Sequence, residues 1–185
     1  GFALAQCKLG NLYYNGTGVI KDIDEAKKWY EMAAAQKNAE AEYHLACLYE
    51  MEKNENENVE KGVSGNNNIS KDNEKAAEYY RRSAEHGYAP AQVIIGKRYL
   101  TANSSKDIEE AKKWILKAAE QEYVEAEYLL AKMYEEGTVF EKNDKKAADY
   151  YRLSAEHGNV DAQYWLAQAF YDGKGGIDKN LEEAA

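Results

Sequence analysis

A short pattern recurs five times along the chain, and this repetition limits what the chain can fold into. The five copies align without gaps and begin at Ala5, Ala41, Ala91, Ala126 and Ala162. Successive copies start 36, 50, 35 and 36 residues apart. A period of this length is typical of repeat proteins in which each copy contributes one supersecondary unit. The chain is therefore expected to be an array of repeats.

Each copy contains two segments with the periodicity of an amphipathic helix. In the first segment of the fourth copy, Ala126, Leu130, Met133 and Tyr134 fall at positions i, i+4, i+7 and i+8. The second segment begins at Glu25, Lys75, Glu110 and Lys146, with a fifth start at Glu183. Its apolar residues also share one helical face. We call the two predicted helices of each repeat helix A and helix B.

Residues that favour helix ends separate these segments. The start of each helix B is predicted to be capped by Asp22, Asp72, Asp107, Asn143 and Asn180. A glutamate three residues after the cap predicts capping boxes at Glu25, Glu110 and Glu183. Left-handed C-terminal caps are expected at Gly16, Gly87 and Gly158. The only proline, Pro90, falls in the first turn of a predicted helix A.

Two amphipathic helices cannot bury both apolar faces alone, so each pair must stack on the next. The sequence thus predicts an all-α fold, an α/α solenoid of stacked antiparallel helix pairs that forms a superhelix of about ten helices. Residues 1–185 are expected to be one repeat domain that is truncated at both ends, with exposed end faces that associate end to end. The predicted repeats span residues 3–38, 39–88, 89–123, 124–159 and an incomplete 160–185.

The second repeat carries an insertion between its two helices. Segment 53–70 is rich in Asn, Glu, Gly and Ser, a composition that buries little apolar surface, so it is predicted to be an unordered loop. Two interpretations stay open: a functional loop, or an insertion that a surface position tolerates.

Charge and composition exclude several classes of function. With 24 Lys and Arg against 33 Asp and Glu, the net charge is −9, which disfavours nucleic acid and membrane surfaces as partners. No apolar run reaches the roughly 18 to 20 residues of a membrane span, and the first residues lack a basic signal-peptide head. A soluble protein is expected, and its compartment stays open.

No arrangement of residues predicts catalysis, a metal or a cofactor. His86 and His157 occupy the same repeat position before a helix cap, which favours a structural role, and His44 is solitary. Cys7 and Cys47 are too few for a disulfide scaffold or a structural zinc site and are expected to pack as small apolar residues. We therefore expect a protein that is not an enzyme.

A stripe on helix A is the candidate binding surface, because helix A is expected to line the concave side of such a solenoid. We call it the groove stripe. It comprises the residues two, six and nine positions after each leading alanine. The predicted partner-binding residues are Tyr43, Val93, Tyr128, Tyr164, Asn11, Lys97, Lys132, Gln168, Tyr14, Glu50, Glu135 and Tyr171. An aromatic stripe flanked by Lys, Gln and Glu fits an extended peptide or a partner helix. Packing of Tyr43, Tyr128 and Tyr164 against the adjacent repeat is the alternative.

The first repeat resembles a known family. Its residues Leu9-Gly10, Tyr13, Gly16, Gly18 and Val19, followed by Asp22 to Ala34, are similar to the Sel-one-like repeat (SLR) of the tetratricopeptide superfamily. The resemblance implies an adaptor or scaffold that holds a protein or peptide on the concave helix A face, from a bacterial source. It also implies two alternatives: a toxin-immunity or virulence-associated protein with one tight partner, and a β-lactam or cell-wall hydrolase. The hydrolase branch carries paired cysteines in every repeat, which this sequence lacks.

Overall fold

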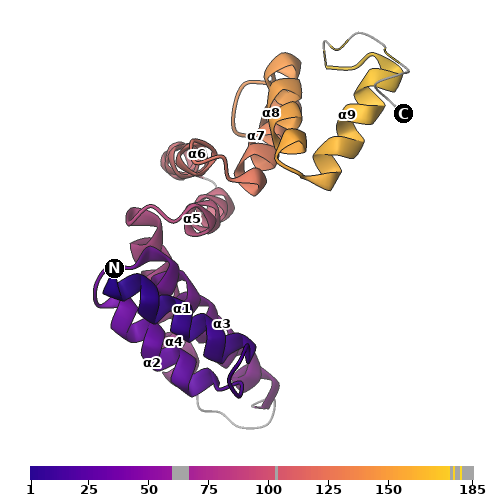
Figure 1. The fold of residues 1–185 in the computed structure, drawn as a ribbon. Coiled ribbons are helices and arrows are strands. Elements are labelled where there is room, and N and C mark those ends of the chain that lie inside the picture. The colour runs from indigo at the N-terminus through magenta and orange to yellow at the C-terminus, as the bar shows by residue number, and fades with distance from the viewer. Residues whose placement is uncertain (60–66, 103, 176, 178–179, 181–185) are drawn as a thin grey trace. The chain divides into compact units, whose positions relative to one another are not determined.

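In a computed structural model that describes residues 1–59, 67–102, 104–175, 177 and 180, these segments form nine α-helices and no strand (Figure 1). The helices are α1 Phe2–Asn15, α2 Ile23–Ala34, α3 Ala39–Val59, α4 Asn67–Glu85, α5 Ala89–Ala102, α6 Ser105–Ala119, α7 Val124–Glu136, α8 Asp144–Glu156 and α9 Val160–Asp172. Odd-numbered helices occupy the helix A segments and even-numbered helices the helix B segments. The predicted all-α array of helix pairs is confirmed, and the position of the fifth helix B lies outside the described residues.

The chain divides into two compact units, Gly1–Ile94 and Ile95–Ala185. In the first unit α1 packs on α2, α2 on α3 and α3 on α4. In the second unit α6 packs on α7, α7 on α8 and α8 on α9. Contacts between consecutive helices are what a stack of helical hairpins requires, because each hairpin buries its apolar faces against its neighbours.

The core of each unit combines small and large residues from both helices of a pair, for example Leu130 on helix A and Ala147 on helix B. The leading alanines Ala41, Ala91, Ala126 and Ala162 are completely buried. Helix B contributes the buried tyrosines Tyr30, Tyr80 and Tyr151. Alanine lets two helix backbones approach closely, and a buried tyrosine ring fills the space beside them.

In repeats one and three, a glycine of helix A packs directly against a large side chain of helix B. A Cβ atom at Gly10 would lie 2.6 Å from Cε1 of Tyr30, and one at Gly96 would lie 2.6 Å from Cγ1 of Ile115. Both distances are shorter than carbon atoms tolerate, so a larger residue would force the helices apart. Repeats two and four carry Ala46 and Ala131, both completely buried, at the same position.

Most of the predicted helix ends are confirmed. Asp22 and Asn143 cap α2 and α8 by accepting hydrogen bonds from the backbone N–H groups of Glu25 and Lys146, both at 2.9 Å. Gly16 ends α1 in the left-handed conformation, with φ 73°, as its position predicted. Gly87 and Gly158 also have positive φ, and Pro90 lies in the first turn of α5.

Two predicted caps and two predicted capping boxes are wrong. The box at Glu110 fails because Asp107 is not the cap of its helix, and Glu183 lies outside the described residues. Helix α6 is capped by Ser104 in place of Asp107, which is the third residue of the helix and accepts a hydrogen bond from the Ser104 hydroxyl. Asp72 lies inside α4, because that helix begins at Asn67. In a capping box, the Glu25 carboxylate would accept a hydrogen bond from the backbone N–H of Asp22. That N–H donates instead to the Tyr13 carbonyl, and the Glu25 carboxylate binds Lys28 at 2.8 Å, so this box is absent.

The predicted unordered loop 53–70 is also wrong over much of its length. Helix α3 continues to Val59 and α4 begins at Asn67, and residues 60–66 lie outside the described part of the chain. Composition indicated only that the segment could not build a core of its own. It did not account for extension of two helices that are already nucleated, which costs far less than starting a new helix.

Candidate functional site

The predicted groove stripe separates into members that are buried, members that bind helix B and members that are exposed. Val93 is 2% exposed, as buried as Cys7 at the same position of repeat one, and this leaves no side-chain surface for a partner. Asn11, Tyr14, Glu50 and Glu135 are half-buried. The exposed members are Lys97, Lys132, Tyr164, Gln168 and Tyr171.

The polar, half-buried members hold the hydroxyl groups of the buried helix B tyrosines. Tyr30 donates to Oδ1 of Asn11 at 2.7 Å, and Tyr80 donates to Oε2 of Glu50 at 2.8 Å. In repeat four, Tyr151 donates to Oε2 of Glu135 at 2.6 Å. A buried hydroxyl without a partner is costly, so these three polar residues have a structural role that the sequence pattern did not reveal. Burial, with the carboxylate of Glu135 as a second cause, raises the pKa of Tyr151 far above its usual value.

Repeat three confirms this pairing by replacing both of its members. Ile115 stands where the other repeats carry tyrosine, and Leu100 stands where repeats two and four carry glutamate. Leu100 packs against the cluster that contains the completely buried Ile115. A carboxylate is thus found where a hydroxyl needs an acceptor, and an aliphatic side chain is found where none is needed.

Helix A of one repeat also stacks an aromatic ring on the helix B tyrosine of the preceding repeat. His44 stacks on Tyr30 with ring centroids 4.9 Å apart, and Trp165 stacks on Tyr151 at 4.0 Å. The Trp165 indole N–H donates to Oε1 of Glu135 at 3.0 Å, so both oxygens of Glu135 accept hydrogen bonds. These contacts fix the register between adjacent repeats.

The aromatic members of the stripe differ in how much surface they leave open. Tyr43 contacts three rings, those of His44, Tyr80 and Tyr88, at centroid distances between 5.1 and 5.7 Å. Tyr128 meets Tyr151 edge-on at 5.8 Å and is half-buried. Tyr164 is 65% exposed. Packing therefore dominates at Tyr43, whereas Tyr128 and Tyr164 keep surface that a partner can contact.

An open groove of 720 Å³ lies along the helix A face of the second unit, and we call it the helix A groove. Its walls come from α5, from α7 and from the start of α9. The lining residues are Lys97, Tyr123, Val124, Glu125, Tyr128, Leu129, Lys132, Gly158, Asn159, Val160 and Asp161. Lys97, Tyr128 and Lys132 are members of the predicted stripe, and the structure brings them together here.

The charges in the helix A groove are partly neutralised. The Lys97 ammonium lies 2.5 Å from Oε1 of Glu125. Lys132 is exposed and has no carboxylate within ion-pair distance among the described residues. Val160 is 74% exposed at the groove edge, and Asp161 adds a carboxylate in the first turn of α9. The groove therefore offers apolar, aromatic and charged contacts side by side.

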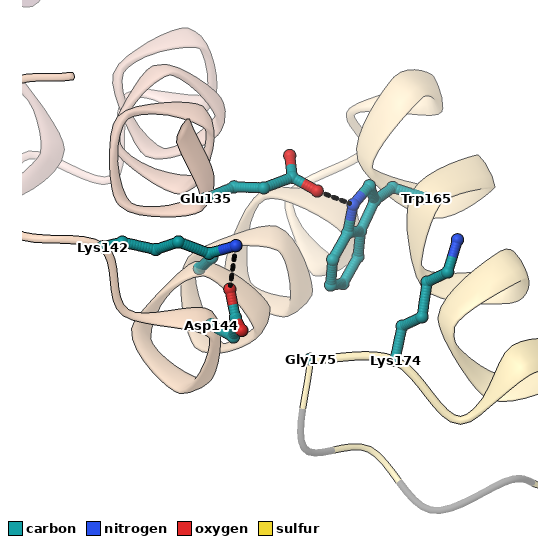
Figure 2. A pocket seen from close by; sticks show the side chains of 7 residues that line it. Glu135, Lys142, Asp144, Trp165, Lys174 and Gly175 are labelled. Carbon is teal, nitrogen blue, oxygen red and sulfur yellow. Dashed lines mark hydrogen bonds and ion pairs between the residues drawn. The ribbon is translucent and has the colours of Figure 1, made fainter. Parts of the chain in front are cut away.

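A second, smaller hollow of 220 Å³ lies between α7, α8 and α9 (Figure 2). Glu135 and Trp165 form one side through their hydrogen bond, and the Lys142 ammonium lies 3.5 Å from Asp144 on the other. Lys174 and Gly175 close the rim. Because its polar groups largely bind one another, this hollow offers few unsatisfied groups to a ligand.

Two fully buried glutamates were missed by the sequence reasoning. Oε2 of Glu42 lies 2.6 Å from Nδ1 of His86. Oε1 of Glu42 lies 2.8 Å from the Arg82 guanidinium, which is an ion pair but does not have the geometry of a hydrogen bond. The carboxylate of Glu127 contacts Nδ1 of His157 at 2.9 Å. Both glutamates follow the leading alanine of helix A, and both histidines end helix B of the same repeat. This coincidence of Glu and His in repeats two and four was the available signal.

Neither of the two cysteine thiols is activated as a nucleophile. Burial raises the pKa of the Cys7 thiol to about 12, and burial also raises the pKa of Cys47. A thiol with a raised pKa stays protonated and is a poor nucleophile. No group of three or more His, Cys, Asp or Glu residues in the described segments could hold a metal ion. Within those same segments, no helix is both long and apolar enough to cross a membrane.

A protein-family model matches five consecutive segments of the chain. A family model described as the Sel1 repeat matches residues 3–38, 39–88, 89–123, 124–159 and 160–185. The chain belongs to the Sel1 repeat family. Proteins of this family generally mediate protein–protein interaction. No curated protein matches the chain at a significant level.

Solved Sel1 repeat structures share the fold. A Sel1 repeat protein from Oxalobacter formigenes is 32% identical with a TM-score of 0.77, over 98% of this chain and 69% of that one. Protein c5321, described as a protective antigen in uropathogenic Escherichia coli, is 29% identical with a TM-score of 0.75, over 100% of this chain and 36% of that one. The immunity protein Pa5087 from Pseudomonas aeruginosa is 23% identical with a TM-score of 0.63, over 98% of this chain and 64% of that one. That last similarity concerns the fold alone.

Proposed function

We propose that this Sel1 repeat protein is an adaptor that binds a protein or peptide in the helix A groove of its second unit. The observation that carries the proposal is the 720 Å³ groove, which joins Lys97, Tyr128 and Lys132 from three predicted stripe positions. Concave surfaces of solenoids present many side chains at a regular spacing, which suits extended or helical partners.

The chemistry of the helix A groove supports a partner segment with mixed character. Tyr128 and the exposed Val160 offer apolar contact area, and tyrosine provides it at a low cost in conformational entropy. Lys132 offers an ammonium group to an acceptor, and Asp161 offers a carboxylate to a donor. A segment with one apolar anchor between polar groups would satisfy these contacts.

Glu50, Glu135 and Asn11 are left out of the proposed binding surface. Their side chains already accept hydrogen bonds from buried tyrosines, and a partner would have to break those bonds. Tyr14, Tyr164, Gln168 and Tyr171 stay in the proposal as secondary contacts.

A pull-down from lysate of the source organism, read by mass spectrometry, tests this proposal. The parent chain is compared with Tyr128→Ala/Lys132→Glu/Tyr164→Ala, after circular dichroism shows that the variant is folded. Lys117→Glu is the matched control, because Lys117 is an exposed lysine of α6 outside the groove. We expect the groove variant to lose a partner that the parent and the control both retain. Equal capture by all three proteins would contradict the proposal.

A single tight partner, as for an immunity or virulence-associated protein, is the narrower alternative. The 29% identity to protein c5321 gives it some support, whereas the similarity to Pa5087 concerns only the fold. One dominant protein that co-elutes with the chain at equal stoichiometry would favour this alternative. Several weakly held proteins would favour a general scaffold.

We propose further that the protein acts without catalysis. The raised pKa values of both cysteine thiols support this, because a catalytic cysteine needs a lowered one. A β-lactam turnover assay provides the check, and hydrolysis above background would contradict the proposal.

A further inference from the structure

We infer that Glu127 and His157 tie the two walls of the helix A groove together, so that the groove holds a partner most tightly while His157 is charged and less tightly once His157 has lost its proton. This inference rests on the proposed function, because it concerns the regulation of the same groove. It adds two positioning residues that do not line the groove themselves.

The two walls belong to different parts of the second unit. One wall is the side of α7 that carries Glu125 and Tyr128, and the other is the turn from α8 into α9, residues 158–161. Glu127 stands between Glu125 and Tyr128 in the sequence, but its side chain is completely buried. His157 is the last residue before the second wall begins. The pair thus connects the first wall to the second.

Side-chain contacts of Ser154 and His157 hold the end of α8 and the turn against α7. Nδ1 of His157 lies 3.0 and 2.9 Å from the two carboxylate oxygens of Glu127. The Ser154 hydroxyl donates to the Val124 carbonyl at 3.1 Å, and the Ser154 carbonyl accepts the N–H of Asn159 at 2.9 Å. The serine contact is neutral, whereas the histidine contact changes its charge near physiological pH. A change of pH therefore acts on the walls through His157.

The turn is bonded firmly to the start of α9. Oδ1 of Asn159 accepts the N–H of Ala162 at 2.8 Å, and the Asn159 carbonyl accepts the N–H of Gln163 at 3.0 Å. The Gln163 side chain donates to the Ala155 carbonyl of α8 at 3.0 Å. These bonds join the end of α8, the turn and the first turn of α9 into one block. When the contact with Glu127 loosens, this block shifts as a whole and carries the second wall with it.

The groups around His157 favour its charged form. The hydrogen bond to Glu127 raises the pKa of His157, and burial opposes this effect to a smaller extent. Glu122 in the turn before α7 and Glu156 on α8 raise this pKa further. Tyr150 of α8 also senses the charge of Glu127, but burial raises the pKa of this phenol above its usual value, so it stays neutral. His157 is thus charged at lower pH and becomes neutral as pH rises through its raised pKa.

Loss of the proton leaves a buried carboxylate without a cation. Leu153 stands where repeat two carries Arg82, so no second cation contacts Glu127 among the described residues. Asp161, the ionisable residue in the first turn of α9, has the wrong sign to replace His157. A buried charge without a partner is unfavourable, and the carboxylate responds by drawing in water or by moving away from the neutral ring. Either change loosens the contact that holds the second wall.

Repeat two offers a comparison inside the same chain. The turn after α4 has a hydrogen bond from the Tyr88 N–H to the Ser83 carbonyl at 3.0 Å, which corresponds to the bond of Asn159 in repeat four. There Arg82 lies 2.8 Å from the buried Glu42 and stays charged at every pH near neutrality. The Tyr88 bond is therefore the matched control for the Asn159 bond.

Hydrogen exchange of backbone amides, measured by NMR on the full chain between about pH 6 and 8, tests whether the second wall loosens. Protection factors are corrected for the intrinsic pH dependence of exchange. We expect the protection of Asn159 to fall at least about fivefold over this range, while that of Tyr88 changes less than about twofold. Leu153→Arg supplies the missing cation and should reduce the loss at Asn159 to below about twofold. No fall at Asn159 in the parent, or an equal fall at Tyr88, would overturn the inference without any variant.

The affinity of the partner captured in the pull-down, measured by isothermal titration at about pH 6 and 8, tests whether the loosened wall affects binding. We expect binding by the parent to weaken at least about fivefold more than binding by Leu153→Arg, since ionisable groups on the partner affect both proteins equally. Equal weakening in the two proteins would overturn the inference, even where Asn159 loses protection. Failure to capture any partner would contradict the proposed function, and the exchange measurement would still decide whether Glu127 and His157 hold the wall.

Discussion

Repeats two and four hold their helix pairs together with buried charge, whereas repeats one and three use neutral groups at the same positions. In repeat four the buried Glu127 meets His157, and in repeat one Gln6 accepts a hydrogen bond from Gln36 at 2.5 Å. Repeats two and four also bury Ser83 and Ser154, which donate to the carbonyls of Ala39 and Val124. Repeats one and three carry alanine at that position. The array thus alternates between two kinds of repeat, and one helix scaffold tolerates both kinds of polar interior.

The two charged repeats also differ from each other. Glu42 in repeat two has Arg82 and His86 as cationic partners, whereas Leu153 stands at the position of Arg82 in repeat four. His157 is therefore the cation that Glu127 depends on among the described residues. Arginine is always charged and histidine is not, so the buried carboxylate of repeat two keeps a permanent cationic partner, whereas that of repeat four relies on a group that can lose its charge.

The largest expected effect comes from removing the cations around Glu42. Arg82→Ala/His86→Ala leaves a completely buried carboxylate without a charged partner, which should cost about 3–5 kcal/mol of unfolding free energy. The matched change in repeat one, Met32→Ala/Gln36→Ala, removes no charge and should cost about 1 kcal/mol. Denaturant unfolding measures both. Equal losses would mean that the two kinds of repeat do not differ energetically.

Removal of Glu135 should have the next largest effect. Glu135→Ala leaves the hydroxyl of Tyr151 and the indole N–H of Trp165 without their acceptor, at a cost of about 1–3 kcal/mol. Glu135→Gln keeps one carbonyl acceptor and should lose clearly less. Thermal unfolding of both variants provides the measurement. An unchanged melting temperature in Glu135→Ala would return this residue to the candidate binding surface.

A double-mutant cycle in repeat three tests whether the tyrosine and its acceptor form one unit. Ile115→Tyr alone buries a hydroxyl without an acceptor, and Leu100→Glu alone places a carboxylate against an aliphatic residue. Gly96 leaves space for the ring, as Gly10 does beside Tyr30. The two changes together should be less destabilising than the sum of the single changes, with a favourable coupling of about 0.5–3 kcal/mol. Additive losses would contradict the pairing.

The smallest effect concerns pH. A hydrogen bond to Glu127 raises the pKa of His157 above its usual value, so its charged form stabilises the folded state. This contribution is complete below the unfolded pKa of about 6.5 and is lost as pH rises through the higher folded value. Leu153→Arg places a permanent cation at the position of Arg82 and should reduce this loss. The melting temperature of the parent should therefore fall relative to that of the variant as pH rises from about 6 to 9.

The other histidine with a shifted pKa responds in the opposite direction. Burial lowers the pKa of His44 in repeat two, so its neutral form is favoured in the folded state and stability is lost as pH falls below about 6.5. Comparison of the parent with Leu153→Arg cancels this contribution, because both proteins contain His44. Parallel curves for the two proteins would contradict the role of His157.

The periodicity of apolar residues predicted most of the fold, because every repeat meets the same requirement to bury its apolar helix faces. Each helix pair must bury two apolar faces, and the positions of Ala126, Leu130 and Tyr134 reflect that requirement directly. Helix ends were predicted less well, since Ser104 and Asp107 both favour a cap and only the path of the chain selects between them.

The candidate site was predicted less completely than the fold. Helical geometry placed Glu135 and Lys132 on the same stripe, but it did not show that Tyr151 reaches Glu135 from the neighbouring helix. A periodic pattern assigns a residue to a face and says nothing about which partner side chain arrives there. The buried Glu127 was missed for the same reason, because a glutamate is seldom buried without a partner and the pattern of one helix does not show that His157 is that partner.

The central claim is that this Sel1 repeat chain binds its partner through the helix A groove. The most direct test measures how tightly the captured partner binds variants in which one exposed lysine is replaced. Isothermal titration compares the parent with Lys132→Glu in the groove and Lys117→Glu on α6 outside the groove, with melting temperatures checked for each. We predict at least about tenfold weaker binding for Lys132→Glu, with no change in melting temperature and little change for Lys117→Glu. Unchanged affinity in Lys132→Glu would contradict the account.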